Sequence, residues 1–185
     1  PFDHYLIPRF TSFNIPVDKE EKDISIHELF AGIVEDEMRN QLIINDVVQC
    51  HKNGRNCLVL TERTNHVELL ALELSKRIQD VISLTGGMGI KETRETMVRL
   101  SKTPDEMPLT LVATGRYIGE GFDEPRLDTL FLAMPISWKG TLQQYAGRLH
   151  RLFETKKEVL IYDYVDVRLR MLEKMYNKRL AGYAS

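Results

Sequence analysis

The chain has 185 residues, of which 43% are hydrophobic and 28% are charged, a length that suits one α/β domain with a single core and is short for two. No apolar run is long enough to span a membrane, and the amino terminus lacks the layout of a signal peptide, so we expect a soluble, cytoplasmic protein. Cys50 and Cys57 lie outside any CxxC or mixed Cys/His cluster. This argues against a metal site or a disulfide and indicates free thiols in a reducing compartment.

The net charge of −2 hides an uneven distribution. Residues 1–138 carry 15 basic and 22 acidic side chains, whereas residues 139–185 carry 10 basic and 5 acidic ones. We therefore expect the carboxyl-terminal part to face phosphate, unless its charges only solvate the surface.

The chain begins without methionine, as a piece of a longer polypeptide would. A strand is predicted over residues 5–15, and the capping box Ser25-x-x-Glu28 predicts a short helix over residues 26–34. A longer helix is predicted over residues 36–52, and Asn53-Gly54 ends it.

Short apolar runs bounded by glycine, proline or polar turns predict the remaining strands. They lie at residues 56–61, 80–84, 109–113, 127–133 and 157–164. Helices are predicted between them, and a charged helix over residues 166–180 closes the pattern. This alternation is typical of a doubly wound α/β fold, with a mostly parallel sheet of about five or more strands and helices on both faces.

Three of these strands end in residues that could approach a ligand, because ligands bind at the carboxyl edge of open α/β sheets. Arg63 follows the strand at residues 56–61, Thr85-Gly86 follows the strand at residues 80–84, and Thr114-Gly115 follows the strand at residues 109–113. Glycines there would let backbone amides approach phosphate, and a threonine hydroxyl could bond a phosphodiester without reading bases. The plainer interpretation is that Arg63 decorates a helix start and that the glycines only suit strand-to-helix turns.

Thr141-Leu-Gln-Gln144 has the form of a capping box and predicts another helix. Arg148 and Arg151 then lie three residues apart on one helical face, where both guanidiniums could reach one phosphate group. Without a neighbouring motif, two solvated surface arginines would explain the pair.

Two motifs in this part of the chain resemble those of superfamily 2 helicases, in their second RecA-like lobe. Thr114-Gly115 followed by Gly121-Phe122-Asp123 resembles the fifth motif, and Gln144 with Gly147-Arg148 and Arg151 resembles the sixth. The form of the sixth motif is more similar to restriction-type and repair-type DNA translocases than to DEAD-box RNA helicases.

The resemblance implies three groups of site residues and no metal ligand. The catalytic arginine fingers would be Arg148 and Arg151. The ATP-binding residues would be Gly121, Asp123 and Gln144, although a turn before Pro125 and helix capping explain the last two without a ligand. The nucleic-acid-binding residues would be Arg63, Thr85, Gly86, Thr114 and Gly115.

The chain has no GxxxxGK[ST] sequence, so ATP and Mg²⁺ would be held mainly by an upstream lobe, and this chain alone would have no ATPase activity. We expect residues 1–185 to form a single helicase C-terminal domain, with residues 1–35 as a lead-in from the upstream lobe and residues 166–185 as a C-terminal helix. Its partners would be the upstream lobe and a nucleic acid, which we expect to be DNA rather than RNA. We expect no association with a membrane.

Two residues depart from the family's pattern and bear on whether the nucleotide site is intact. Arg116 stands where an acidic or small residue is common, and Tyr145 replaces a frequent arginine. The alternative is therefore a non-catalytic nucleic-acid-binding or adaptor domain that retains the helicase fold. A self-contained Rossmann enzyme is excluded, because no GxGxxG sequence follows the first strand.

Overall fold

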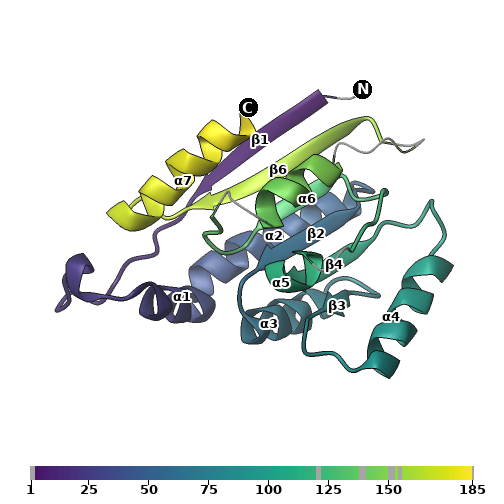
Figure 1. Cartoon of the computed structure of the whole chain (residues 1–185), viewed down its shortest axis with the longest axis horizontal. Helices are drawn as coiled ribbons and strands as arrows, with labels where there is room; N and C mark the ends of the chain where they lie inside the picture. Colours follow the sequence, from purple (N-terminus) through teal and green to yellow (C-terminus); the bar gives the residue numbers. More distant parts are fainter. Residues whose placement is uncertain (1–2, 120–121, 138–140, 150–152, 154–155, 185) are drawn as a thin grey trace.

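Figure 1 shows the computed structural model of the chain, which describes residues 3–119, 122–137, 141–149, 153 and 156–184. Within this part, six strands form one parallel sheet in the order β1-β6-β5-β2-β4-β3. Helices pack on both faces, which confirms the predicted α/β architecture. No helix among these residues has the length and apolar character needed to cross a bilayer.

The elements follow the predicted positions to within a few residues. The strands are β1 (Asp3–Phe10), β2 (Cys57–Thr61), β3 (Ile82–Leu84), β4 (Thr110–Thr114), β5 (Thr129–Leu132) and β6 (Glu158–Val165). The helices are η1 (Glu21–Asp23), α1 (Ile26–Glu35), α2 (Glu37–Lys52), α3 (Thr64–Ser75), α4 (Ile90–Lys102), α5 (Gly115–Gly119), α6 (Thr141–Leu149) and α7 (Arg170–Tyr183).

Two segments differ from the sequence-based expectation. The first strand ends at Phe10, opposite Val165 at the end of its partner strand, and the Thr11 side chain beyond it donates a hydrogen bond to the buried carboxylate of Asp166. The segment directly after β4, predicted as a glycine-rich loop, begins with the short helix α5. This helix forms where Tyr117 and Ile118 pack into the apolar core beside the sheet.

The amino-terminal strand is part of the sheet. β1 lies at its edge and pairs in parallel with β6, from Asp3 opposite Glu158 to Phe10 opposite Val165 (Figure 1).

Side chains of the central strands alternate between two apolar cores, as the two-residue period of a strand requires. Leu58 and Leu60 of β2 join the core beneath α5 and α6. Cys57 and Val59 join the opposite core, beneath α2 and α3. Cys50 and Cys57 are both buried free thiols, as predicted. A third cluster lies at the carboxyl edge and includes Phe13, Leu29, Ile33, Met134, Leu169 and Leu172.

A buried histidine ties α2 to the end of β2. The Asn40 amide nitrogen donates to the Val34 carbonyl, which leaves the Asn40 Oδ1 to accept from His66 Nε2 at 2.9 Å. His66 Nδ1 is therefore unprotonated and accepts from the Thr61 hydroxyl at 2.7 Å. Burial, with a smaller contribution from the Arg39 guanidinium, lowers the pKa of His66 to about 3. The ring is a neutral structural group.

This network predicts a loss of stability in mild acid. Because the folded-state pKa of His66 lies below the unfolded value of about 6.5, the neutral ring contributes fully to the free energy of unfolding above pH 6.5. As the pH falls from there towards 3, this contribution decreases by about 1.4 kcal/mol per pH unit. His66→Gln should flatten this dependence while lowering stability at neutral pH. Urea unfolding at a series of pH values measures both effects.

The exposed His27 supplies the control. His27→Gln should keep the wild-type pH profile. Identical acid slopes for wild type and His66→Gln would show that the ring is not held neutral.

Candidate functional site

The three predicted phosphate-contacting segments meet at one edge of the sheet. β4 lies between β2 and β3, and all three strands are parallel, so their carboxyl ends lie side by side. Arg63 follows β2, Thr85 and Gly86 follow β3, and Thr114 and Gly115 mark the end of β4. The tertiary structure thus brings together all five residues predicted to contact nucleic acid.

Two close approaches join these segments. A methyl carbon built on Gly115 would lie 3.1 Å from the Oε1 atom of Glu62, at the end of β2. One built on Gly86 would lie 3.8 Å from the Cδ atom of Arg116. Arg116, which departs from the family's pattern, therefore places its side chain beside the Thr85-Gly86 turn and adds a basic group to this edge.

Thr114 is more enclosed than the sequence suggested, with only 6% of its surface exposed. Its hydroxyl oxygen accepts a hydrogen bond from the backbone N–H of Tyr117 at 3.4 Å, at the start of α5. The hydroxyl hydrogen can still be donated to an acceptor, but the side chain has a structural role in addition to the predicted one.

Arg63 lies against α1. Its guanidinium carbon is 5.9 Å from the centroid of the Phe30 ring, and its Nη2 atom donates to the His27 carbonyl at 3.3 Å. These contacts hold α1 against the end of β2. A guanidinium has five N–H groups, so others can still bond a phosphate.

The helix predicted to carry the arginine fingers is present as α6. Leu142, Tyr145, Ala146 and Leu149 form its buried stripe, so Tyr145, where an arginine is frequent in the family, serves as a core residue.

The remaining predicted residues can be placed only in part. The side chains of Gln144 and Arg148, and Gly121 and Arg151 as a whole, lie outside the described residues. Asp123 is exposed, directly after the buried Phe122.

Two buried ion pairs, which the sequence analysis did not predict, fix the segment that leads into α6. Arg39 of α2 contacts Asp166 at 2.9 and 3.2 Å and also donates to the Ala133 carbonyl. Arg179 of α7 contacts Asp163 at 2.8 Å through each of two nitrogens and donates to the Ile136 carbonyl at 3.2 Å. Both guanidiniums are thus bonded to the segment between β5 and α6.

The sequence feature that could have indicated these ion pairs is a basic residue within the apolar stripe of a helix. Arg39 precedes Ile43 by four residues, and Arg179 follows Leu172 by seven. That signal does not reveal which acid is the partner.

Removal of one charge should therefore destabilise the fold strongly. Arg179→Met should lower the free energy of unfolding by about 3–5 kcal/mol, because it leaves the Asp163 carboxylate buried without its cation. Lys91→Met, which removes an exposed charge facing Glu95, should change it by less than about 0.5 kcal/mol. Urea unfolding of both variants tests this, and equal small effects would contradict it.

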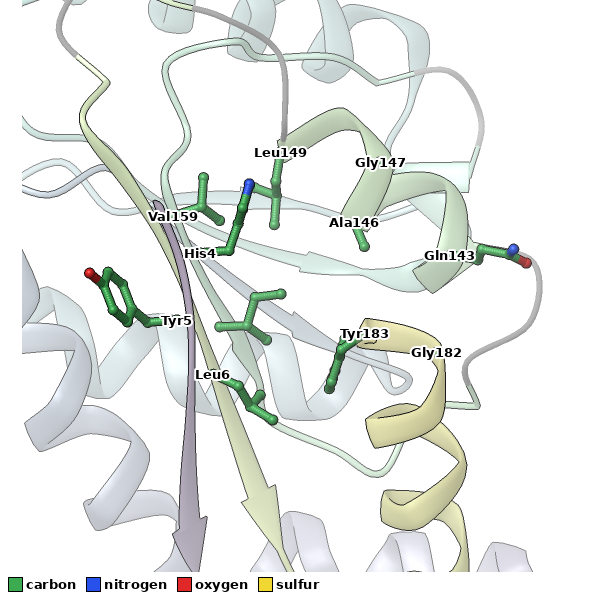
Figure 2. A pocket seen from close by; sticks show the side chains of 11 residues that line it. His4, Tyr5, Leu6, Gln143, Ala146, Gly147, Leu149, Val159, Gly182 and Tyr183 are labelled. Carbon is green, nitrogen blue, oxygen red and sulfur yellow. The ribbon is translucent and has the colours of Figure 1, made fainter. Parts of the chain in front are cut away.

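A groove of about 540 Å³ lies away from this edge, between α6 and α7 (Figure 2). The amino-terminal halves of β1 and β6 form its floor. Figure 2 shows His4 and Leu6 on the side of the groove, whereas the Tyr5 ring points away from it. None of the described residues predicted to contact nucleotide or nucleic acid lines this groove.

The described residues do not form a metal centre. No group of three or more His, Cys, Asp or Glu side chains among them could hold a metal ion.

A protein-family match includes the ends of β2, β3 and β4 and helix α6. Residues 38–153 match the family model described as the helicase conserved C-terminal domain. The chain belongs to this helicase C-terminal domain family. The matched span runs from α2 past α6, and the predicted resemblance to superfamily 2 helicases is confirmed.

Two curated relatives come from viruses. The transcript termination protein A18 of fowlpox virus is 27% identical over 159 residues, covering 83% of this chain and 34% of the relative. The putative helicase 161L of invertebrate iridescent virus 6 is 30% identical over 161 residues, covering 82% of this chain and 35% of the relative. This chain thus spans about a third of the length of these relatives.

A solved structure supports the fold assignment. The crystal structure of T4 UvsW matches with a TM-score of 0.73 at 19% sequence identity, covering 99% of this chain and 39% of that chain. The match confirms the RecA-like fold of the helicase C-terminal domain.

The position of Thr114 leads to a prediction with two measurements. Thr114→Val keeps the side-chain volume but removes the hydroxyl, so it should lower the free energy of unfolding by about 0.5–1 kcal/mol, as expected for a lost helix cap. If the hydroxyl also donates to a phosphate, the same variant should weaken nucleic-acid binding by about 0.5–1.5 kcal/mol, alike for all sequences. Urea unfolding and fluorescence anisotropy measure the two effects.

Thr93→Val on α4 is the matched control and should change neither quantity. A loss of binding without a loss of stability would show that the Thr114 hydroxyl does not cap α5. A changed sequence preference would contradict a contact to the nucleic-acid backbone.

Proposed function

We propose that this chain is the second motor lobe of an ATP-dependent helicase or translocase. The observation that carries the proposal is the convergence of Arg63, Thr85-Gly86 and Thr114-Gly115 at the carboxyl edge of three neighbouring parallel strands. A surface of backbone amides, hydroxyls and guanidiniums can hold a phosphodiester backbone without selecting bases, which a motor that moves along any sequence requires.

The nucleic acid is proposed to be DNA rather than RNA. The form of the sixth motif, with Gln144 and Arg148 in α6, supports this choice by its similarity to DNA translocases. The names of the viral relatives, a transcript termination protein and a putative helicase, fit a protein that acts on nucleic acid.

ATP is proposed to bind between this lobe and an upstream lobe. The chain has no GxxxxGK[ST] sequence, and its described residues form no cluster that could hold a metal ion, so the upstream lobe would bind the triphosphate and Mg²⁺. When bound there, ATP supplies the phosphoryl group whose transfer to water drives movement.

The contribution of this chain would be positive charge. Arg148, from α6, and Arg151 would face the transferring phosphoryl group and stabilise the charge that develops on it. Arg39 and Arg179 would position this helix indirectly, since they fix the segment between β5 and α6.

The proposal predicts a large and selective effect of the two arginines. Arg148→Ala and Arg151→Ala, each made in the full-length protein, should lower kcat for ATP hydrolysis by about 10³-fold or more. Nucleic-acid affinity should change little, because these charges act on the transition state and not on the bound strand. Nucleic-acid-stimulated phosphate release and fluorescence anisotropy are the measurements.

Lys157→Ala, at an exposed basic residue of the same carboxyl-terminal part, is the control and should leave kcat unchanged. Loss of nucleic-acid affinity with normal turnover would mean that Arg148 and Arg151 contact the strand. A full-length protein without ATPase activity would favour the non-catalytic adaptor.

A further inference from the structure

A pocket of about 360 Å³ opens at the carboxyl edge, beside the surface proposed to hold nucleic acid. Its walls are mainly apolar and consist of Ile26, Phe30, Pro135, Ile136, Leu142 and Met175. Glu62 and Ser137 are its polar lining residues. A volume near the low end of the roughly 300–1,000 Å³ range of ligand pockets suits one flat ring system better than a whole nucleotide.

Glu62 belongs to both the pocket and the phosphate-contacting edge. Its Oε1 atom would lie 3.1 Å from a methyl carbon built on Gly115, and its side chain lines the pocket. Among the described residues, its carboxylate takes part in no hydrogen bond or ion pair. Its neighbours partly desolvate the side chain, although the residue as a whole remains exposed, and this raises the pKa of the carboxyl. The pocket therefore contains a carboxylate that has no protein donor among the described residues.

The partner of this carboxylate cannot be a phosphate. An ionised carboxylate repels phosphate oxygens and only accepts hydrogen bonds, so a strand held at Gly115 must offer it a donor from a base or a sugar. A base also matches the apolar walls, because bases stack on aromatic rings and pack well against methionine. Phe30 is held in place on this wall by the Arg63 guanidinium.

Guanine fits this acceptor better than the other bases. Its N1–H and N2–H groups are adjacent donors that can bond both carboxylate oxygens, as a guanidinium does. Thymine and uracil present one N–H between two carbonyls, whereas adenine and cytosine place a ring acceptor beside the amino group. Each of these would bring an acceptor towards Glu62.

We propose that this pocket receives one guanine base from the bound strand, with Glu62 as the acceptor for its N1–H and N2–H groups. The inference rests on the proposed function, because the strand must first be held at Gly115. It adds a base preference to a surface that otherwise contacts only the backbone.

Fluorescence anisotropy with the full-length protein tests the proposal. The probes are a labelled oligothymidylate, the same oligonucleotide with one central guanine, and a third with hypoxanthine in that position. Hypoxanthine lacks the N2 amino group, so it reports on the second hydrogen bond. We expect guanine to tighten binding by about fivefold or more over thymine, the lower end for a bidentate contact, and hypoxanthine to lose most of this advantage.

The variants separate the base contact from general electrostatics. Glu62→Gln should abolish the advantage of guanine over thymine, whereas Glu68→Gln, at an exposed glutamate of α3, should keep the advantage and leave binding to oligothymidylate unchanged. If wild type binds all three probes equally well, the guanine pocket is refuted while the proposed function stands. If wild type binds none of them, both proposals fail.

Discussion

Two buried carboxylates at the end of β6 hold this fold together. Asp163 and Asp166 are 0% and 1% exposed, and isolated charges at that depth would cost several kcal/mol each. Arg179 from α7 and Arg39 from α2 neutralise them, and each guanidinium has another N–H group for a carbonyl in the segment before α6. The last strand, a helix on each face of the sheet and the approach to α6 therefore depend on the same two ion pairs.

This arrangement connects the two halves of the proposed motor. The segments proposed to contact phosphate lie at the ends of β2, β3 and β4, whereas helix α6, which carries Arg148, follows β5. Glu62 and the Pro135–Ser137 segment line one pocket between these regions. This shared pocket lies between the proposed nucleic-acid edge and the segment that leads into α6.

The sequence predicted the local elements well, because their signals are local. Ser25 accepts the predicted hydrogen bond from the Glu28 N–H, and Gly54, with φ of 79°, ends α2 as the Asn53-Gly54 pair indicated. Prediction failed for α5, because Tyr117 and Ile118 are buried by distant strands. The buried Thr114 hydroxyl was also not foreseen as an acceptor for the first turn of α5. The roles of Gly121, Asp123, Gln144, Arg148 and Arg151 stay predictions.

By itself, the sequence determined the alternation of strands and helices, the Ser25 helix cap and the two motifs that resemble those of helicase C-terminal domains. Only the tertiary structure decided the strand order, and with it the meeting of Glu62 with Gly115 and of Arg39 with Asp166. It also decided that His66 stays neutral and that Tyr145 is a core residue. The reason is physical. Periodicity and capping act over a few neighbouring residues, whereas burial, pKa shifts and ion pairing depend on groups that are distant in sequence and meet only when the sheet is assembled.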